Sequence, residues 1–229
     1  MKTKNYNQGG GGNKNYTAVL DRCAQEQFYF WKIDSNVDVY NFLENKGWKF
    51  VATEQSFREL VENPTGDDLF SSYLSAQVQS GSQNIDYDSM VISKADGSIT
   101  SGLFENGYKL KIESANVQLS QTPLWDSYAP FRRAAKKEAD KSNIYYAREN
   151  GNCLVLTNDN DQIKAIGLTL NYCLRPADLL VWMVIDEYIT RQKAVWVYKK
   201  TKERDVAWVP KDMTFAEYFR KTKLNFDKK

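Results

Sequence analysis

The most regular alternation of apolar and polar side chains in this chain lies between residues 90 and 112. Three alternating segments are separated there by Asp96-Gly97 and Asn106-Gly107. Both dipeptides accept the positive φ angles of tight hairpin turns. The pattern therefore predicts an antiparallel meander of three strands with an optional fourth. The strands are expected at residues 90–94, 98–104, 108–112 and 117–119.

Helices are predicted where apolar residues recur with a period near 3.6 and capping residues stand at the ends. Gly47 is placed to close a helix in the left-handed conformation. Asn63-Pro64 must end another helix, and Thr214 with Glu217 forms the capping box of the last one. The expected helices begin at Thr17, Asp38, Thr53, Asp67, Pro130, Pro176 and Thr214.

Short apolar segments supply the remaining strands. Two of them, at residues 153–157 and 162–172, are joined by the polar residues 158–161 and predict a hairpin. The run 179–185 is apolar on all sides, and Pro176 favours a buried helix there over a central strand. The other strands are expected at residues 48–52, 194–198 and 206–209.

These elements together predict an α+β fold. Its sheet is expected to be mainly antiparallel, made of the central meander and C-terminal hairpins, and packed with five to seven helices. Residues 1–16 contain four consecutive glycines and predict a flexible N-terminal arm, because glycine loses the most conformational freedom on ordering. Residues 17–229 are expected to form a single domain, with a sub-boundary near residues 80–84 ahead of the meander at 85–120.

The chain contains no histidine. This excludes Ser-His-Asp and Cys-His nucleophiles, histidine general bases and histidine-ligated metal ions. It also predicts that assembly varies little between about pH 6 and 8, unless a strongly shifted carboxyl, thiol or terminal amine titrates in that range.

Charge is distributed unevenly along the chain, although its net value is only +2. Residues 34–126 carry six basic and fourteen acidic side chains, whereas residues 190–229 carry twelve and five. Such asymmetry favours contact between copies of the chain or with an acidic partner. Aromatic residues make up 14% of the chain, which both an aromatic core and a contact-rich surface explain.

Two basic groups are the candidate binding residues for an anion or nucleic acid. The first lies on the helix expected at residues 131–141, and the second in the turn of the expected C-terminal hairpin, where Trp196, Tyr198 and Trp208 flank it. The candidate binding residues are Arg132, Arg133, Lys136, Lys137, Lys199, Lys200, Lys202 and Arg204.

The acidic residues are weaker candidates for a functional site than the two basic groups. Asp86 and Asp88 share one face if their segment is extended, an arrangement that holds a divalent ion in some enzymes. The Gly66-Asp67-Asp68 triplet is explained by a capped helix start. Asp159 and Asp161 lack the glycine and glutamate spacing of a calcium loop and are explained by a polar hairpin turn. No metal site and no cofactor is therefore expected.

Three cysteines, at positions 23, 153 and 173, form no Cys-x-x-Cys pair, so we expect buried thiols in a reducing compartment. No apolar run approaches the ~20 residues of a membrane helix, and the N-terminus does not match a signal peptide. The protein is expected to be cytoplasmic or part of a virion, without membrane contact.

The sequence favours a non-enzymatic structural or assembly protein, a subunit of a larger homo- or hetero-oligomer whose arm contacts neighbouring subunits. A virus or phage particle component fits this description best. The alternative is a nucleic-acid-binding module that uses the basic helix at residues 131–141 and the basic turn at 199–204. A third interpretation is a metal-dependent enzyme built on Asp86 and Asp88.

Overall fold

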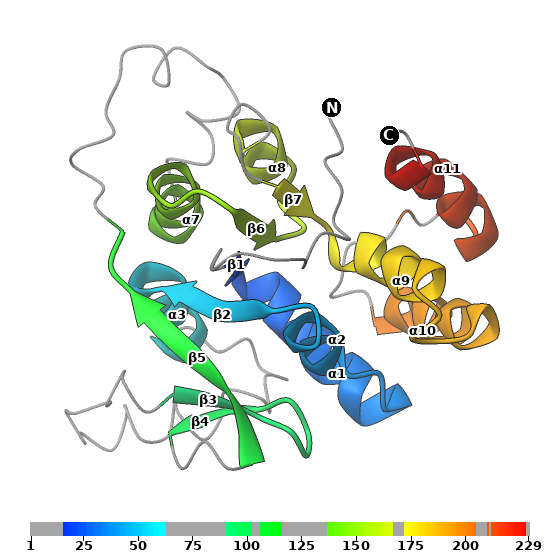
Figure 1. Ribbon diagram of the computed structural model, residues 1–229, viewed down its shortest axis with the longest axis horizontal. Coiled ribbons are helices and arrows are strands. Elements are labelled where there is room, and N and C mark those ends of the chain that lie inside the picture. The colour runs from blue at the N-terminus through cyan, green and yellow to red at the C-terminus, as the bar shows by residue number, and fades with distance from the viewer. Residues whose placement is uncertain are drawn as a thin grey trace.

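A seven-stranded sheet with helices on both faces forms the molecule (Figure 1). The structure is a computed structural model that describes residues 16–62, 90–101, 106–115, 137–166, 172–204, 210 and 212–227. The strands of this described part are β1 (Tyr16–Leu20), β2 (Trp48–Thr53), β3 (Met90–Ser93), β4 (Ile99–Ser101), β5 (Gly107–Glu113), β6 (Cys153–Leu156) and β7 (Tyr172–Leu174). Its helices are α1 (Arg22–Ser35), α2 (Val39–Glu44), α3 (Glu54–Glu62), α7 (Glu138–Glu149), α8 (Asn160–Ile166), α9 (Pro176–Ile185), α10 (Arg191–Arg204) and α11 (Phe215–Asp227).

The sheet is mostly parallel, so the expected mainly antiparallel α+β fold is wrong and the fold is α/β. The strand order is β4-β3-β5-β2-β1-β6-β7, and the five strands from β5 to β7 run parallel. The antiparallel pairs are β3 with β4 and β3 with β5. Parallel strands covered by helices on both faces are apolar on both sides. This is the case for β1, β2 and β6, which are buried along most of their length.

Two hydrophobic cores lie on the two faces of the sheet. Along β1, Ala18 and Leu20 point into the larger core, which α1, α2, α9, α10 and α11 cover. Val19 points into the smaller core, which α7 and α8 cover. Packed rings fill much of the larger core, so an aromatic core explains these side chains. They include Phe28, Tyr40, Phe50 and Tyr108.

The predicted turn and helix ends that depend on a capping residue, a glycine or a proline are confirmed. Gly47 has a φ of +80° directly before β2, and the Thr53 hydroxyl accepts a backbone N–H of α3 at 3.3 Å. Helix α9 begins at Pro176 and is buried, as expected. Glu217 accepts the backbone N–H of Thr214 at 2.8 Å, which confirms the capping box of α11.

Other predicted elements are wrong. Residues 17–20 form a strand, residues 160–166 form α8, and residues 194–198 belong to α10. The meander has a different order, because β3 and not β4 lies beside β5. Short apolar runs fit a helix or a strand equally well, and tertiary packing decides between them.

Several expectations fall outside the described residues. They are the arm except for Tyr16, the helix at 67–79, the sub-boundary near 80–84, the strand at 117–119, the start of the helix at Pro130 and the strand at 206–209. Within the ranges that are described, no helix is both long and apolar enough to cross a lipid bilayer.

Candidate functional site

The direction of strand addition reverses at β1. From β1 the chain builds the sheet towards β2 and β5 on one side, and towards β6 and β7 on the other. Leu20 and Leu156 are paired at the carboxyl ends of β1 and β6. In doubly wound parallel sheets, ligands bind outside the carboxyl ends of the two strands at such a switch point. The residues that follow Leu20 and Leu156 therefore define the candidate site.

Asp21 follows β1 directly and is the N-cap of α1, where its carboxylate accepts the Arg22 N–H at 2.9 Å. The same carboxylate accepts the Thr157 hydroxyl at 2.6 Å and the Cys23 thiol at 3.1 Å. Burial raises the pKa of Asp21 above its usual value, and the charge of Asp159 raises it further. Asp21 thus places a buried carboxyl group at the switch point.

The loop after β6 supplies Asp159. Its Oδ1 atom accepts the N–H groups of Asp161 and Gln162 at 2.7 and 2.9 Å and so caps α8. The expected hairpin turn at residues 158–161 is therefore wrong, since the loop leads into a helix. The other oxygen, Oδ2, lies 3.7 Å from the Nζ atom of Lys137.

Asp140 reaches the same place from α7. This residue is 6% exposed, and its Oδ1 atom accepts the Gln162 amide at 2.6 Å. Burial and the charges of Asp21 and Asp159 raise the pKa of Asp140 to about 7, although Lys137 lowers it. Asp140 is thus a strongly shifted carboxyl of the kind that would titrate near neutral pH in a chain without histidine.

Lys137 lies between two of these carboxyl groups. Its Nζ atom is 3.5 Å from Asp140 Oδ2 and 3.7 Å from Asp159 Oδ2. The charges of Asp140, Asp159 and Glu59 raise the pKa of Lys137, against a smaller effect of burial, so it remains a cation. One ammonium group therefore faces several carboxyl groups, and ionisation of Asp140 leaves an excess of negative charge here.

A buried network of polar side chains holds α7 against the ends of β2 and β1. Thr53 donates to Asn143 Oδ1 at 2.9 Å and lies 2.7 Å from the Ser142 hydroxyl. Ser56 donates to the same Asn143 oxygen at 3.0 Å, and the Asn143 amide is 3.5 Å from Asp21. Because α7 carries both this network and the Asp140 carboxyl, the network fixes that carboxyl at the switch point.

The described carboxylates of the site form no closed metal-binding cage. Among the residues placed by the structure, no three Cys, Asp or Glu side chains are close enough to form a metal site. Mg²⁺ commonly binds through one or two carboxylates and keeps several waters. The Oδ2 atoms of Asp140 and Asp159 are the candidates for such a pair, since both lie within 3.7 Å of the Lys137 ammonium group. The Cys23 thiol does not suit a metal, because burial raises its pKa well above the usual value.

The two basic groups expected from the sequence do not come together. Lys137 lies in the candidate site as the N-cap of α7, while the second group lies on α10, which packs on the opposite face of the sheet (Figure 1). The members of the second group are Lys199, Lys200, Lys202 and Arg204. Candidates outside the described residues are Arg132, Arg133, Lys136, Asp67, Asp68, Asp86 and Asp88.

Sequence reasoning missed Asp21 and Asp140 and explained Asp159 differently. Asp21 and Asp159 do carry a signal, because each follows a short apolar segment that becomes a buried parallel strand. Asp140 carries no such sequence signal, since it is one of several polar residues within a helix. Its importance depends on what packs against it.

No protein-family model, no curated protein and no solved structure matches this chain. Its function is therefore inferred from the arrangement of its own residues.

Proposed function

We propose that the protein is a metal-dependent hydrolase of phosphate esters, with its active site at the switch point between β1 and β6. One observation carries the proposal: the Lys137 ammonium lies 3.5 and 3.7 Å from the carboxylates of Asp140 and Asp159. It lies at the sheet edge where this type of fold binds ligands. A place that already holds a cation between two carboxylates suits a divalent ion.

Each residue of the site has a separate role in the proposed reaction. Asp140 and Asp159 would bind Mg²⁺ or Mn²⁺ through their Oδ2 atoms, with waters and a phosphate oxygen as further ligands. A bound metal ion would supply an activated water for attack on phosphorus. As the water oxygen bonds to phosphorus it would release a proton to solvent, the bond to the leaving alcohol would break, and the alcohol oxygen would take up a proton from solvent. Lys137, displaced from between the carboxylates, would balance the charge of the phosphoryl group.

Positive charge next to the site favours an anionic substrate. Lys137 is the N-cap residue of α7, and Lys141 lies one turn further along that helix. Phosphate esters are anions that these two cations would attract.

This proposal differs from the expected non-enzymatic assembly protein, because carboxylate–metal chemistry needs no histidine. The assembly hypothesis, including a virus or phage particle component, depended on the arm at residues 1–16, of which 1–15 lie outside the described part. It stays a prediction. Size-exclusion chromatography with light scattering tests it, and a strict monomer under all conditions would contradict it.

Hydrolysis of bis(p-nitrophenyl) phosphate tests the proposed function. We expect turnover that requires Mg²⁺ or Mn²⁺ and stops in EDTA. Asp140→Asn should lower the rate about 100-fold or more, because it removes the charge that holds the metal ion.

Asp186→Asn is the matched control. Asp186 pairs with Lys46 at the end of α9, away from the switch point, so this variant should keep the rate of the natural chain. The proposal fails if the natural chain shows no metal-dependent turnover, or if Asp140→Asn hydrolyses the substrate as fast as the control does.

A further inference from the structure

Helix α10 presents a regular stripe of side chains to solvent. Its other side packs on α1, α9 and α11 and is buried. Residues spaced three and four apart lie on one face of a helix. The exposed stripe consists of Gln192, Val195, Trp196, Lys199, Lys200 and Glu203. Over its whole length α10 carries six basic side chains and one acidic side chain, so its surface is strongly positive.

Trp196 lies in the middle of this stripe. It is 40% exposed, and its neighbour Val195 is 45% exposed. The ammonium groups of Lys193 and Lys200 lie 5.5 and 6.0 Å from the centre of the Trp196 ring. An exposed ring next to cations offers one surface for a stacked base and charges for the adjacent phosphates.

The other basic residues of α10 have structural partners. Arg204 forms bonds of 2.8 and 2.9 Å with Asp34, and its guanidinium lies 4.0 Å from the centre of the Phe30 ring. Lys202 donates to a backbone carbonyl at 3.1 Å. The basic residues around Trp196 are Lys193, Lys199 and Lys200, of which Lys200 also pairs with Glu203.

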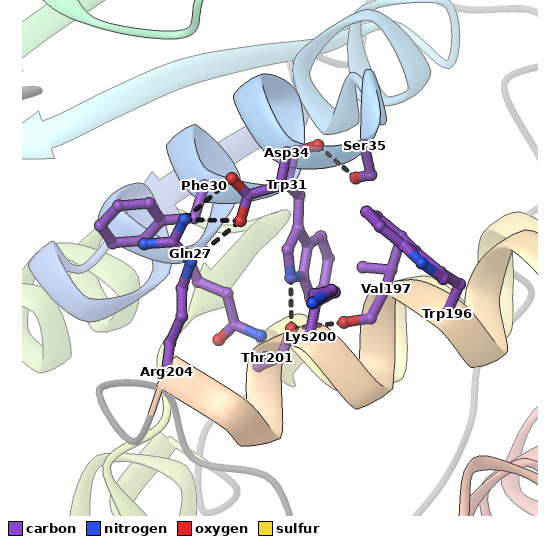
Figure 2. Close-up of a pocket in the computed structure, with 10 residues that line it drawn as sticks. All are labelled: Gln27, Phe30, Trp31, Asp34, Ser35, Trp196, Val197, Lys200, Thr201 and Arg204. Atoms are coloured by element: carbon purple, nitrogen blue, oxygen red, sulfur yellow. Dashed lines mark hydrogen bonds and ion pairs between the residues drawn. The ribbon is translucent and has the colours of Figure 1, made fainter.

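A crevice lies between α1 and α10 beside this stripe. Figure 2 shows Trp196 near one end of the crevice and Arg204 near the other. Gln27 lines the crevice, and its Oε1 atom accepts the amide of Asn158 at 3.2 Å. Asn158 immediately precedes Asp159, so one side chain connects the active-site loop with the crevice. The buried Nε2 atom of Gln27 has no hydrogen-bond partner among the described residues.

We propose that the face of α10 around Trp196 binds single-stranded nucleic acid, and that this strand is the substrate hydrolysed at the switch point. The identity of the substrate rests on the proposed function, whereas binding to α10 does not. A single strand is favoured over a duplex because stacking on Trp196 needs an unpaired base. Along α1, Asp34 beside the crevice lies about 20 Å from Asp21, so a strand bound on α10 would need to extend at least that far to reach the switch point.

Fluorescence anisotropy with labelled oligouridylate and oligothymidylate tests binding, in EDTA so that no strand is cut. The two probes compare RNA with DNA. We expect Trp196→Ala to weaken binding about 10-fold or more, because it removes the stacking surface. The double variant Lys199→Glu and Lys200→Glu should weaken binding and reduce its logarithmic salt dependence by about 0.7 for each lost phosphate contact.

The control is the double variant Lys109→Glu and Lys111→Glu. It makes the same change in net charge on β5, which lies away from α10 (Figure 1), and should bind as the natural chain does. The same Lys109→Glu and Lys111→Glu variant should hydrolyse bis(p-nitrophenyl) phosphate at the rate of the natural chain.

The outcomes separate the two proposals. Strand binding that depends on Trp196 without any phosphate-ester hydrolysis would overturn the proposed function and leave the binding surface standing. The binding surface is overturned if the natural chain binds neither probe at low salt, or if both α10 variants bind as tightly as the control. Preferential binding of polyglutamate would also overturn it, in favour of an acidic protein partner.

Discussion

Asp140 shows how one buried residue sets the properties of the candidate site. It is 6% exposed, and burial favours its neutral form. The folded protein therefore holds this proton more tightly than the unfolded chain does. Ionisation of Asp140 costs stability in the metal-free protein, and a bound cation would offset that cost. Carboxyl groups with strongly raised pKa values occur preferentially at functional sites.

The effect of Asp140 on stability depends on pH in a defined direction. Its pKa rises from 3.8 in the unfolded chain to about 7 in the folded protein. Its stabilising contribution is therefore complete below pH 3.8 and is lost as the pH rises through about 7. In EDTA, we expect the free energy of unfolding to fall between pH 5 and 8 by about 2 kcal/mol more in the natural chain than in Asp140→Asn. Urea titrations of both proteins across this pH range measure the difference in unfolding free energy. Parallel pH profiles of the two proteins would contradict the prediction.

The sequence could not identify the residues of the site as a group. Asp21, Asp140 and Asp159 come from three distant segments, and only folding brings them together. Lys137 was expected to bind an anion because of the basic run around it. In the structure Lys137 is the N-cap residue of α7, and its ammonium group faces two carboxylates of the protein itself, so binding of an external anion there stays a prediction.

At the level of helices and strands, prediction succeeded where local chemistry sets an end. Pro176 and the Thr214 capping box are examples, since their effects depend on neighbouring residues alone. Prediction failed for α10, whose valines and aromatic rings favour a strand. Packing overrides that weak preference, because one side of α10 is buried against α1, α9 and α11, where Trp31 also donates to the Thr201 hydroxyl at 2.7 Å.

Gly107 tests the pairing of β3 with β5. A Cβ atom at this position would lie 2.9 Å from Val91 Cβ and 3.1 Å from the Ile92 carbonyl oxygen. Gly107→Ala should therefore force the strands apart and lower the free energy of unfolding by about 1 to 3 kcal/mol. Gly151→Ala is the control, because a Cβ there meets no atom within 4 Å. Thermal denaturation compares the two variants, and equal losses of stability would argue against this strand pairing.

The order and direction of the strands across the whole sheet could not be predicted from local sequence patterns. The Asp96-Gly97 turn does join β3 to β4, as expected, but these strands form only the antiparallel edge of the sheet. Its parallel centre depends on connections between strands far apart in the sequence, for which turn residues carry no signal. The switch point exists only at this scale, so neither the fold class nor the position of the site followed from the sequence.

Metal binding at the switch point is the central claim, and anomalous diffraction from crystals grown with Mn²⁺ tests it most directly. We expect an anomalous peak at about 2 Å from an oxygen of Asp140 and an oxygen of Asp159. The Lys137 ammonium should have moved out from between them, and crystals of Asp140→Asn should lack the peak. Crystals that show no peak there, with Lys137 still paired to both carboxylates, would contradict the claim.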